Sequence, residues 1–295
     1  MRVSACITTR NRTQHLDACL RSLWNSHVKP HSIVVSDDSQ DYEVQLQNQQ
    51  VVKQYPGITY ITGPRSGVCG NRNHSVNAIP ASETDIVAFI DDDICVEPDF
   101  IERAIARYQQ MSPEQRNFTI LSGISHCEED GWETVPTKLS FRGYFCATDA
   151  PQAVDIHAAL FPRLFFEQEQ WDENIFFGYE DAELCLRALK RGYRILHCPE
   201  IKVRDIGVNS TLAAPGIGSL SNYEIHIEAA RLYVGIKRYK DLFPNRFKLF
   251  GFVSLYFFQM TVFLLKRGAL QALPEIVRRS RIQRLWEPSG LLGAV

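Results

Sequence analysis

The fold of this chain is decided by residues 86–93, which read Ile-Val-Ala-Phe-Ile-Asp-Asp-Asp. An uninterrupted apolar run of this length is typical of a strand that is buried on both faces. Acidic residues follow at once, and ligands bind outside the carboxyl ends of strands in parallel sheets. Because adjacent carboxylates repel one another and a divalent cation relieves that repulsion, the triplet predicts a metal site. The alternative is a solvated acidic turn in which one aspartate caps the next helix.

Strands and helices alternate on both sides of this run. Apolar runs predict further strands at residues 3–8, 32–36, 58–62, 118–122, 138–145 and 193–197. Helical spacing of apolar residues predicts helices at residues 14–24, 43–55, 71–78, 98–110, 181–191 and 223–239. A segment rich in Gly, Ser, Ala and Pro predicts a loop at residues 210–221. The alternation predicts an α/β fold with a mostly parallel sheet flanked by helices.

The composition is that of an ordinary globular protein. The 295 residues are 45% hydrophobic and 22% charged, and the formal net charge is -2. A nucleic-acid partner is not expected, because such domains are usually strongly basic. The eight cysteines form no C-x-x-C pair, so we expect reduced thiols rather than a zinc ribbon. No apolar signal sequence is visible at the start of the chain, which favours a cytoplasmic location.

Five motifs, in this order, resemble those of the inverting family 2 glycosyltransferases, which have the GT-A fold. The motifs are Thr-Thr-Arg-Asn-Arg at 8–12, Asp-Asp-Ser at 37–39, Gly-Val-Cys-Gly-Asn-Arg-Asn at 67–73, the acidic triplet at 91–93, and Gly-Tyr-Glu-Asp-Ala-Glu-Leu-Cys-Leu-Arg at 178–187. The third motif departs from the family, because Asn71 stands where Ala is usual. The resemblance covers roughly residues 3 to 205, and five motifs in order are far more specific than one.

The resemblance implies a GT-A domain at residues 1–222 and a C-terminal helical appendage at residues 223–295. It implies transfer of a sugar, with inversion, from a nucleotide-diphosphate sugar to a hydroxyl of a glycan or lipid-linked acceptor. A UDP-sugar is the expected donor, and Mn²⁺ or Mg²⁺ is the expected cofactor.

The donor site follows from the first four motifs by resemblance. Thr8 and Arg10 would line the nucleotide pocket, and Asp38 would accept a hydrogen bond from the base. The remaining donor-binding residues would be Arg72 at the base or pyrophosphate, Asp91 at the ribose, and Asp92. Arginine suits this position because its planar guanidinium binds phosphate through two hydrogen bonds.

The expected metal ligands are Asp93, Asp91 and Asp205. Asp205 stands where family members often carry a histidine after the last core strand. Aspartate is the harder ligand, which suits Mg²⁺ or Mn²⁺.

The expected catalytic residues are Asp181 as the general base and Glu180 as a ligand of acceptor hydroxyls. The simpler alternative is that Asp181 caps the helix at residues 181–191. The upstream aromatic cluster of Trp171, Phe176, Phe177 and Tyr179 favours catalysis, because apolar surroundings raise the pKa of a carboxyl group.

Two other functions are considered. A catalytically inactive sugar-binding or scaffolding relative is one alternative, although the acidic residues are intact. A sugar nucleotidyltransferase is the other, but residues 8–12 lack the Gly-rich loop followed by Arg and Lys that such enzymes carry.

The C-terminal region contains an uncharged stretch at residues 249–265, bracketed by Lys248 and Lys266. Its length is at the lower limit for a membrane span. A helix lying in the membrane interface, with basic residues for anionic lipid, fits this pattern and predicts peripheral contact with the inner membrane face. A buried packing helix or a dimer contact is the alternative.

Overall fold

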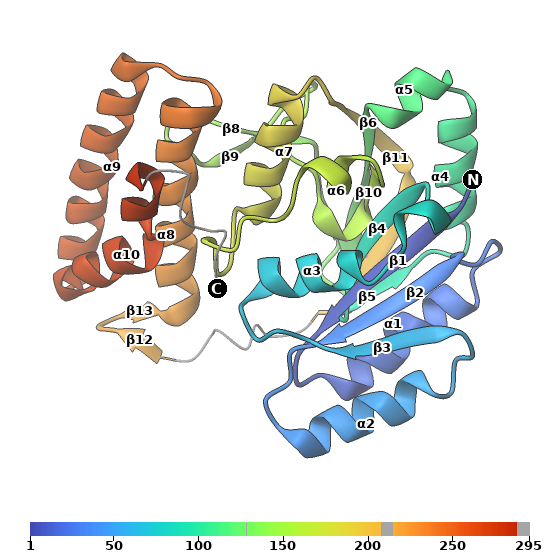
Figure 1. Cartoon of the computed structure of the whole chain (residues 1–295). Coiled ribbons are helices and arrows are strands. Elements are labelled where there is room, and N and C mark those ends of the chain that lie inside the picture. Colours follow the sequence, from blue (N-terminus) through green and yellow to red (C-terminus); the bar gives the residue numbers. More distant parts are fainter. Residues whose placement is uncertain (128, 208–214, 288–295) are drawn as a thin grey trace.

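The computed structural model describes residues 1–127, 129–207 and 215–287, and within them the main sheet has nine strands (Figure 1). The strands of this sheet are β1 (Val3–Thr9), β2 (Ser32–Asp37), β3 (Ile58–Thr62), β4 (Ile86–Asp91), β5 (Ile94–Val96), β6 (Thr119–Cys127), β7 (Trp132–Glu133), β10 (Ala159–Pro162) and β11 (Arg194–Asp205). Their order is β3-β2-β1-β4-β10-β6-β11-β5, with β7 paired to β6.

The predicted α/β fold is confirmed, and the parallel part of the sheet is its N-terminal half. Strands β3, β2, β1 and β4 pair in parallel, as do β6 and β11. Strand β10 lies antiparallel between β4 and β6, and β5 lies antiparallel to β11. The sheet is therefore mixed. Its parallel half aligns the carboxyl ends of β1, β2 and β4 at one edge.

Helices cover both faces of the sheet. They are α1 (Thr13–Trp24), α2 (Tyr42–Val52), α3 (Val68–Asn77), α4 (Phe100–Gln109), α5 (Pro113–Asn117), α6 (Phe165–Gln168) and α7 (Glu180–Lys190). Successive residues of a strand point to opposite faces, so Phe89 and Ile90 enter different apolar cores. Phe89 packs with Phe161 and Leu184, whereas Ile90 packs in the core that includes Leu16 and Phe100. Strand β4 is thus buried on both sides, as its apolar run predicts.

Several predicted elements differ from the structure in kind or in bounds. Residues 138–145 are not one strand but a hairpin of β8 (Thr137–Leu139) and β9 (Phe145–Ala147), because the chain turns through Gly143 at a φ of +80°. The strand predicted at 193–197 extends to Asp205 as β11, through a shift in register between His197 and Lys202. Helix α4 begins at Phe100 rather than at Pro98.

The C-terminal region is helical, as predicted. It comprises α8 (Asn222–Lys237), a π-helical turn (Arg238–Leu242), α9 (Arg246–Lys266) and α10 (Leu273–Ser280). Ser221 and Glu224 form a capping box that starts α8. Strands β12 (Pro215–Ile217) and β13 (Leu220–Ser221) occupy most of the described part of the predicted loop, and residues 210–214 lie outside the described residues.

The C-terminal helices have their own small core, which includes Ile225, Leu232, Phe252, Tyr256 and Met260. Other side chains of α8 pack into the core beneath the main sheet. The appendage is therefore attached to the sheet domain by α8. The boundary expected between residues 222 and 223 falls at the first turn of α8, and the division into two domains there stays a prediction.

Candidate active site

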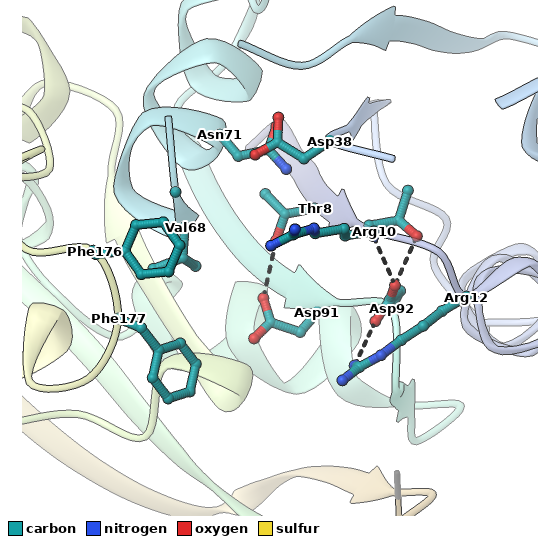
Figure 2. Close-up of a pocket in the computed structure, with 12 residues that line it drawn as sticks. Thr8, Arg10, Arg12, Asp38, Val68, Asn71, Asp91, Asp92, Phe176 and Phe177 are labelled. Carbon is teal, nitrogen blue, oxygen red and sulfur yellow. Dashed lines mark hydrogen bonds and ion pairs between the residues drawn. The ribbon is translucent and has the colours of Figure 1, made fainter. Parts of the chain in front are cut away.

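A pocket lies at the edge where the carboxyl ends of β1, β2 and β4 meet (Figure 2). Its lining consists of Thr8, Thr9, Arg10, Arg12, Asp38, Gly67, Val68, Asn71, Asp91, Asp92, Phe176 and Phe177. The structure therefore brings together five of the six predicted donor-binding residues, which are Thr8, Arg10, Asp38, Asp91 and Asp92.

Asp91 is held by three hydrogen-bonding side chains at the end of β4. Thr8 Oγ1 donates to Asp91 Oδ1 at 3.1 Å, and Arg72 Nη2 lies 3.1 Å from both carboxylate oxygens. His157 Nε2 lies 3.1 Å from Asp91 Oδ2. Burial opposes ionisation, but Arg72 and His157 outweigh it and hold the pKa of Asp91 well below its usual range. Asp91 is therefore a fixed carboxylate at the floor of the pocket.

Arg72 joins the two sides of the site. Its Nη1 lies 3.1 Å from Glu180 Oε1, while Nη2 binds Asp91, and its guanidinium lies 4.9 Å over the Trp171 ring. Only 2% of Arg72 is exposed, and it is outside the pocket lining in the described chain. A contact of Arg72 with the nucleotide stays a prediction. The geometry shows instead a buried cation that ties β4 to the first turn of α7.

The Asp92 side chain contacts the end of β1 and the loop after it, rather than Arg72. Thr9 Oγ1 donates to Asp92 Oδ2 at 2.6 Å, and Arg12 Nη1 lies 3.1 Å from Asp92 Oδ1 and 2.6 Å from Asp93 Oδ2. Burial and the neighbouring Asp93 raise the pKa of Asp92 to about 7, against the opposing effects of Thr9 and Arg12. Arg12 is thus the counter-ion of two adjacent carboxylates, and Figure 2 shows its contact with Asp92.

Asp37 and Asp38 have different surroundings. Asp37 is buried and accepts hydrogen bonds from Asn48 and Tyr60, so it stabilises the end of β2. Asp38 lines the pocket, and its Oδ1 accepts a hydrogen bond from the Arg65 backbone N–H at 2.9 Å. Burial raises the pKa of Asp38. Only the second aspartate of this motif is therefore placed to meet a ligand.

Asp93 and Asp205 come close together through the backbone. The Ile206 N–H donates to the Asp93 carbonyl oxygen at 3.1 Å, and Asp205 is paired in register with Ile94 of β5. Burial and the charges of Asp91 and Asp205 raise the pKa of Asp93, although Arg12 opposes them. Within the described residues, however, no three His, Cys, Asp or Glu side chains are grouped as metal ligands. The three predicted metal ligands thus converge without forming a closed cluster.

The acceptor-side motif turns sharply into α7. Gly178 and Tyr179 both have left-handed backbones, with φ values of +84° and +61°. A left-handed tyrosine is uncommon, and here Phe145 of β9 stacks on its ring at 4.9 Å. Helix α7 then begins with Glu180 and Asp181, and Glu180 accepts a hydrogen bond from the buried guanidinium of Arg72.

Glu180 and Asp181 have different partners. Glu180 is buried and its Oε1 accepts a hydrogen bond from Arg72, whereas its Oε2 has no hydrogen-bond partner in the part of the chain that the structure describes. Asp181 is half-buried, and its Oδ1 accepts a hydrogen bond from the Ala182 N–H at 2.6 Å. Burial and the adjacent Glu180 raise the pKa of Asp181 to about 7. A carboxyl group that ionises near neutral pH is suited to general-base catalysis.

The aromatic cluster predicted near Asp181 divides into two parts. Phe176 and Phe177 line the pocket, and α8 supports them, because Phe176 stacks on His226 at 4.7 Å and Phe177 lies 5.6 Å from Tyr223. Trp171 and Tyr179 are instead buried, each with less than a tenth of its surface exposed. Trp171 therefore supports Arg72 rather than offering a face to a sugar.

Two residues of the site are not identified by the sequence motifs alone. His157 lies in a short 3₁₀ turn (Ile156–Ala158) far along the chain from Asp91, and no motif marks it. Burial disfavours its charged form, but Asp91 outweighs this and raises the pKa of His157 to about 10. Arg12 belongs to the first motif, but its pairing with Asp92 and Asp93 depends on how β1 and β4 lie side by side.

Comparison with known proteins adds a family match. The model of glycosyl transferase family 2 matches residues 4–146. None of the curated proteins compared with this chain matches it.

Solved structures show a similar fold at low identity. Residues 1–349 of S. aureus TarS in complex with UDP are 16% identical, with a TM-score of 0.61, 95% of this chain covered and 79% of that one. GalNAc-T7 with UDP, GalNAc and Mn²⁺ is 14% identical, with a TM-score of 0.62, 91% of this chain covered and 58% of that one. The mannosyltransferase PcManGT from Pyrobaculum calidifontis, in complex with GDP-Man and Mn²⁺, is 15% identical, with a TM-score of 0.56, 97% of this chain covered and 87% of that one. The chain spans only 64% and 49% of two other TarS chains.

Proposed function

Since this chain is a glycosyltransferase of family 2 with the GT-A fold, we propose that it transfers a sugar from a nucleotide-diphosphate sugar to an acceptor hydroxyl, with inversion at the anomeric carbon. One observation carries the proposal. Arg72 binds Asp91 in the pocket wall and Glu180 at the start of α7, so one buried guanidinium couples the donor side to the acceptor side. Such a link holds the donor-binding and acceptor-binding parts of the site in a fixed relative position, as a transfer reaction requires.

The donor is proposed to be a UDP-sugar. Thr8, Arg10 and Asp38 line the pocket and offer a hydroxyl, a cation and an acceptor for a base, as the family motifs imply. The complexes of TarS and GalNAc-T7 contain UDP, and that of PcManGT contains GDP-Man, so nucleoside diphosphates are the shared ligand chemistry of these similar folds.

The residues present fit a divalent cation. Asp93 and Asp205 carry carboxylate oxygens near each other, and burial, the charge of Asp91 and, more weakly, that of Asp205 raise the pKa of Asp93. Mg²⁺ and Mn²⁺ suit one or two protein carboxylates, with water and phosphate oxygens filling the other positions. We propose Asp93 and Asp205 as the principal ligands and Asp91 as a weaker contributor, because Arg72, Thr8 and His157 already occupy its oxygens. When bound, such a cation would neutralise the charge of the leaving diphosphate.

The transfer step is assigned to Asp181. Its carboxylate takes the proton of the acceptor hydroxyl as the oxygen forms a bond to the anomeric carbon. The bond from that carbon to the diphosphate oxygen breaks, and the nucleoside diphosphate leaves with the electron pair. Glu180 Oε2 is buried and lacks a partner among the described residues, and we propose that it accepts a hydrogen bond from another acceptor hydroxyl.

The experiment that tests this function is a thermal-shift screen of the purified protein with UDP, GDP, ADP and CDP, each with and without Mn²⁺, followed by a donor-hydrolysis assay. Binding to the native state raises the melting temperature. We expect UDP with Mn²⁺ to give the largest shift and UDP-sugar to be slowly hydrolysed. Binding without hydrolysis or transfer would favour the inactive sugar-binding relative, and no shift with any nucleotide would refute the proposal.

Arg12→Ala is expected to tighten Mn²⁺ binding several-fold in the absence of donor. The guanidinium lies 2.6 Å from Asp93 Oδ2, so a cation that uses this oxygen must displace it. Removing Arg12 removes that competition and leaves two carboxylates with uncompensated repulsion. Isothermal titration of Mn²⁺ into the donor-free protein measures the effect.

Arg21→Ala is the matched control, because Arg21 lies on the surface of α1 and pairs with Asp17. Its Mn²⁺ affinity should equal that of the unaltered protein. Weaker Mn²⁺ binding by Arg12→Ala would show that Arg12 organises the metal site rather than competing for it.

A further inference from the structure

Helix α9 has two apolar faces, and only one is covered. Its inner face is buried in the small C-terminal core through Phe252, Tyr256, Met260 and Leu264. Its outer face is exposed, with exposed fractions of 92% at Phe247, 76% at Phe250 and 68% at Phe258, and Val262 and Leu265 continue the row. Figure 1 shows α9 at the outer edge of the molecule, on the far side of α8 from the sheet. An exposed apolar row of this length marks an interaction surface.

The contacts of the inner face of α9 decide whether the helix can span a membrane or lie along its surface. By length and composition α9 is the candidate membrane span found among the described residues, and most of it is not buried. However, Tyr256 donates a hydrogen bond to the Glu228 carbonyl oxygen of α8 at 2.9 Å. Because α9 packs on one side against α8, and α8 also packs into the core of the sheet domain, α9 is not free to be surrounded by hydrocarbon. The geometry therefore favours a helix lying along the surface, with its outer side chains inserted.

The charged residues of α9 are all positive. Helix α9 contains no acidic residue, and Arg246, Lys248 and Lys266 are exposed at its two ends. These three cations form no ion pair with any residue of the described chain, whereas the nearby Arg267 pairs with Glu224 at 3.2 Å. Unpaired cations at both ends of an aromatic row complement an anionic lipid headgroup layer.

We propose that the outer face of α9 docks the enzyme on an anionic membrane surface, with the helix parallel to that surface. Phe247, Phe250 and Phe258 enter the boundary between headgroups and acyl chains. Arg246, Lys248 and Lys266 bind the headgroup phosphates at either end.

The β8–β9 hairpin extends the docking surface toward the acceptor side of the active site. A side chain on Gly251 of α9 would lie 3.3 Å from Phe141 in the hairpin turn, so the two segments are in close contact. Four residues on, Phe145 stacks on Tyr179, which directly precedes Glu180 and Asp181. Phe141 and Phe145 are both exposed, so aromatic side chains open to solvent lie between α9 and the residue that precedes the catalytic motif. Resting on the proposed function, this continuity assigns the acceptor to the lipid-linked class.

Vesicle flotation of the full-length chain, without donor or metal, tests the docking. The vesicles are phosphatidylcholine alone or with phosphatidylglycerol, at low and high salt. We expect flotation with anionic vesicles that weakens at high salt, because salt screens surface charges. The variant Phe247→Ser/Phe250→Ser/Phe258→Ser should lose flotation, and Lys248→Glu/Lys266→Glu should weaken it more than about tenfold. Tyr42→Ser, which alters an exposed aromatic residue on α2, should float like the unaltered chain.

The experiments distinguish a failure of membrane docking from a failure of the proposed function. The altered phenylalanines are exposed, so the triple variant should keep its melting temperature and its thermal shift with UDP. The proposal would be overturned if the unaltered chain floats with neither kind of vesicle at either salt concentration. It would also be overturned if the chain floats equally well with neutral and anionic vesicles. A dimer that the triple variant converts to monomer would overturn it as well, because the face would then be covered by a second copy.

Discussion

Asp181→Asn is expected to lower the turnover number by about 10²- to 10⁴-fold, the usual contribution of a general base. The affinity for UDP should stay unchanged, because a base acts in the transition state and Asp181 lies outside the nucleotide pocket within the described chain. Steady-state kinetics, together with titration of UDP, separates the two quantities. Loss of UDP binding would instead make Asp181 structural or part of the metal site. If Glu180→Gln alone is inactive, the roles of the two carboxylates are exchanged.

The pH dependence gives a second readout for Asp181. Burial and Glu180 raise its pKa to about 7, and only the ionised form accepts a proton. The rate should therefore rise with pH through about 7 and level off above it, and Asp181→Asn should lose this dependence. Because the same carboxyl has a pKa of about 3.9 in an unfolded chain, its ionisation costs stability as the pH rises from about 4 to about 7. The asparagine variant should therefore melt no lower than the unaltered protein at pH 8, whereas loss of a structural cap would lower its melting temperature.

Asp93→Ala is expected to lower metal-dependent turnover by at least about 10²-fold, because it removes a charged ligand from the cation that neutralises the leaving diphosphate. The fold should remain intact, since Asp93 is partly exposed and its described side-chain partner is Arg12. Activity is measured with Mn²⁺ and with excess chelator, and circular dichroism checks the fold.

Asp99→Ala is the control for Asp93→Ala, because Asp99 pairs with Arg103 on the surface at the start of α4 and does not line the pocket. Its activity should equal that of the unaltered enzyme. Full activity of the unaltered enzyme in excess chelator would contradict metal dependence and leave Arg12 as the cation nearest Asp93.

Local pattern is sufficient for the elements that carry the motifs. Residues 86–90 predict the strand β4 because they are apolar without interruption, and burial on both faces is the only environment that suits such a run. The acidic triplet follows that strand directly, so the sequence alone predicts its place at the ligand-binding edge of the sheet. The helix predicted at 181–191 begins one residue earlier, at Glu180.

Local pattern fails where the partner of a residue lies far along the chain. The strand predicted at 138–145 is a hairpin because Gly143 takes a left-handed backbone, which the apolar and aromatic residues around it do not indicate. Strand β10 is not predicted because four residues are too few to show a period. Arg72 was expected to reach the base or the pyrophosphate, and that contact stays a prediction. Local pattern does not show that the fold places Asp91 and Glu180 within reach of Arg72, which pair its buried charge.

The sequence by itself determined the α/β class, the edge of the sheet where the pocket lies, and the apolar, cation-bracketed character of α9. Only the tertiary structure decided that His157 and Arg12 join the site, since each meets carboxylates on a different element of the fold. It also decided which face of α9 is free. Both faces are apolar, so periodicity could not distinguish them, and α8 and α10 cover one by packing against it. Side-chain partners and the choice of face depend on contacts between distant segments, which local pattern does not contain.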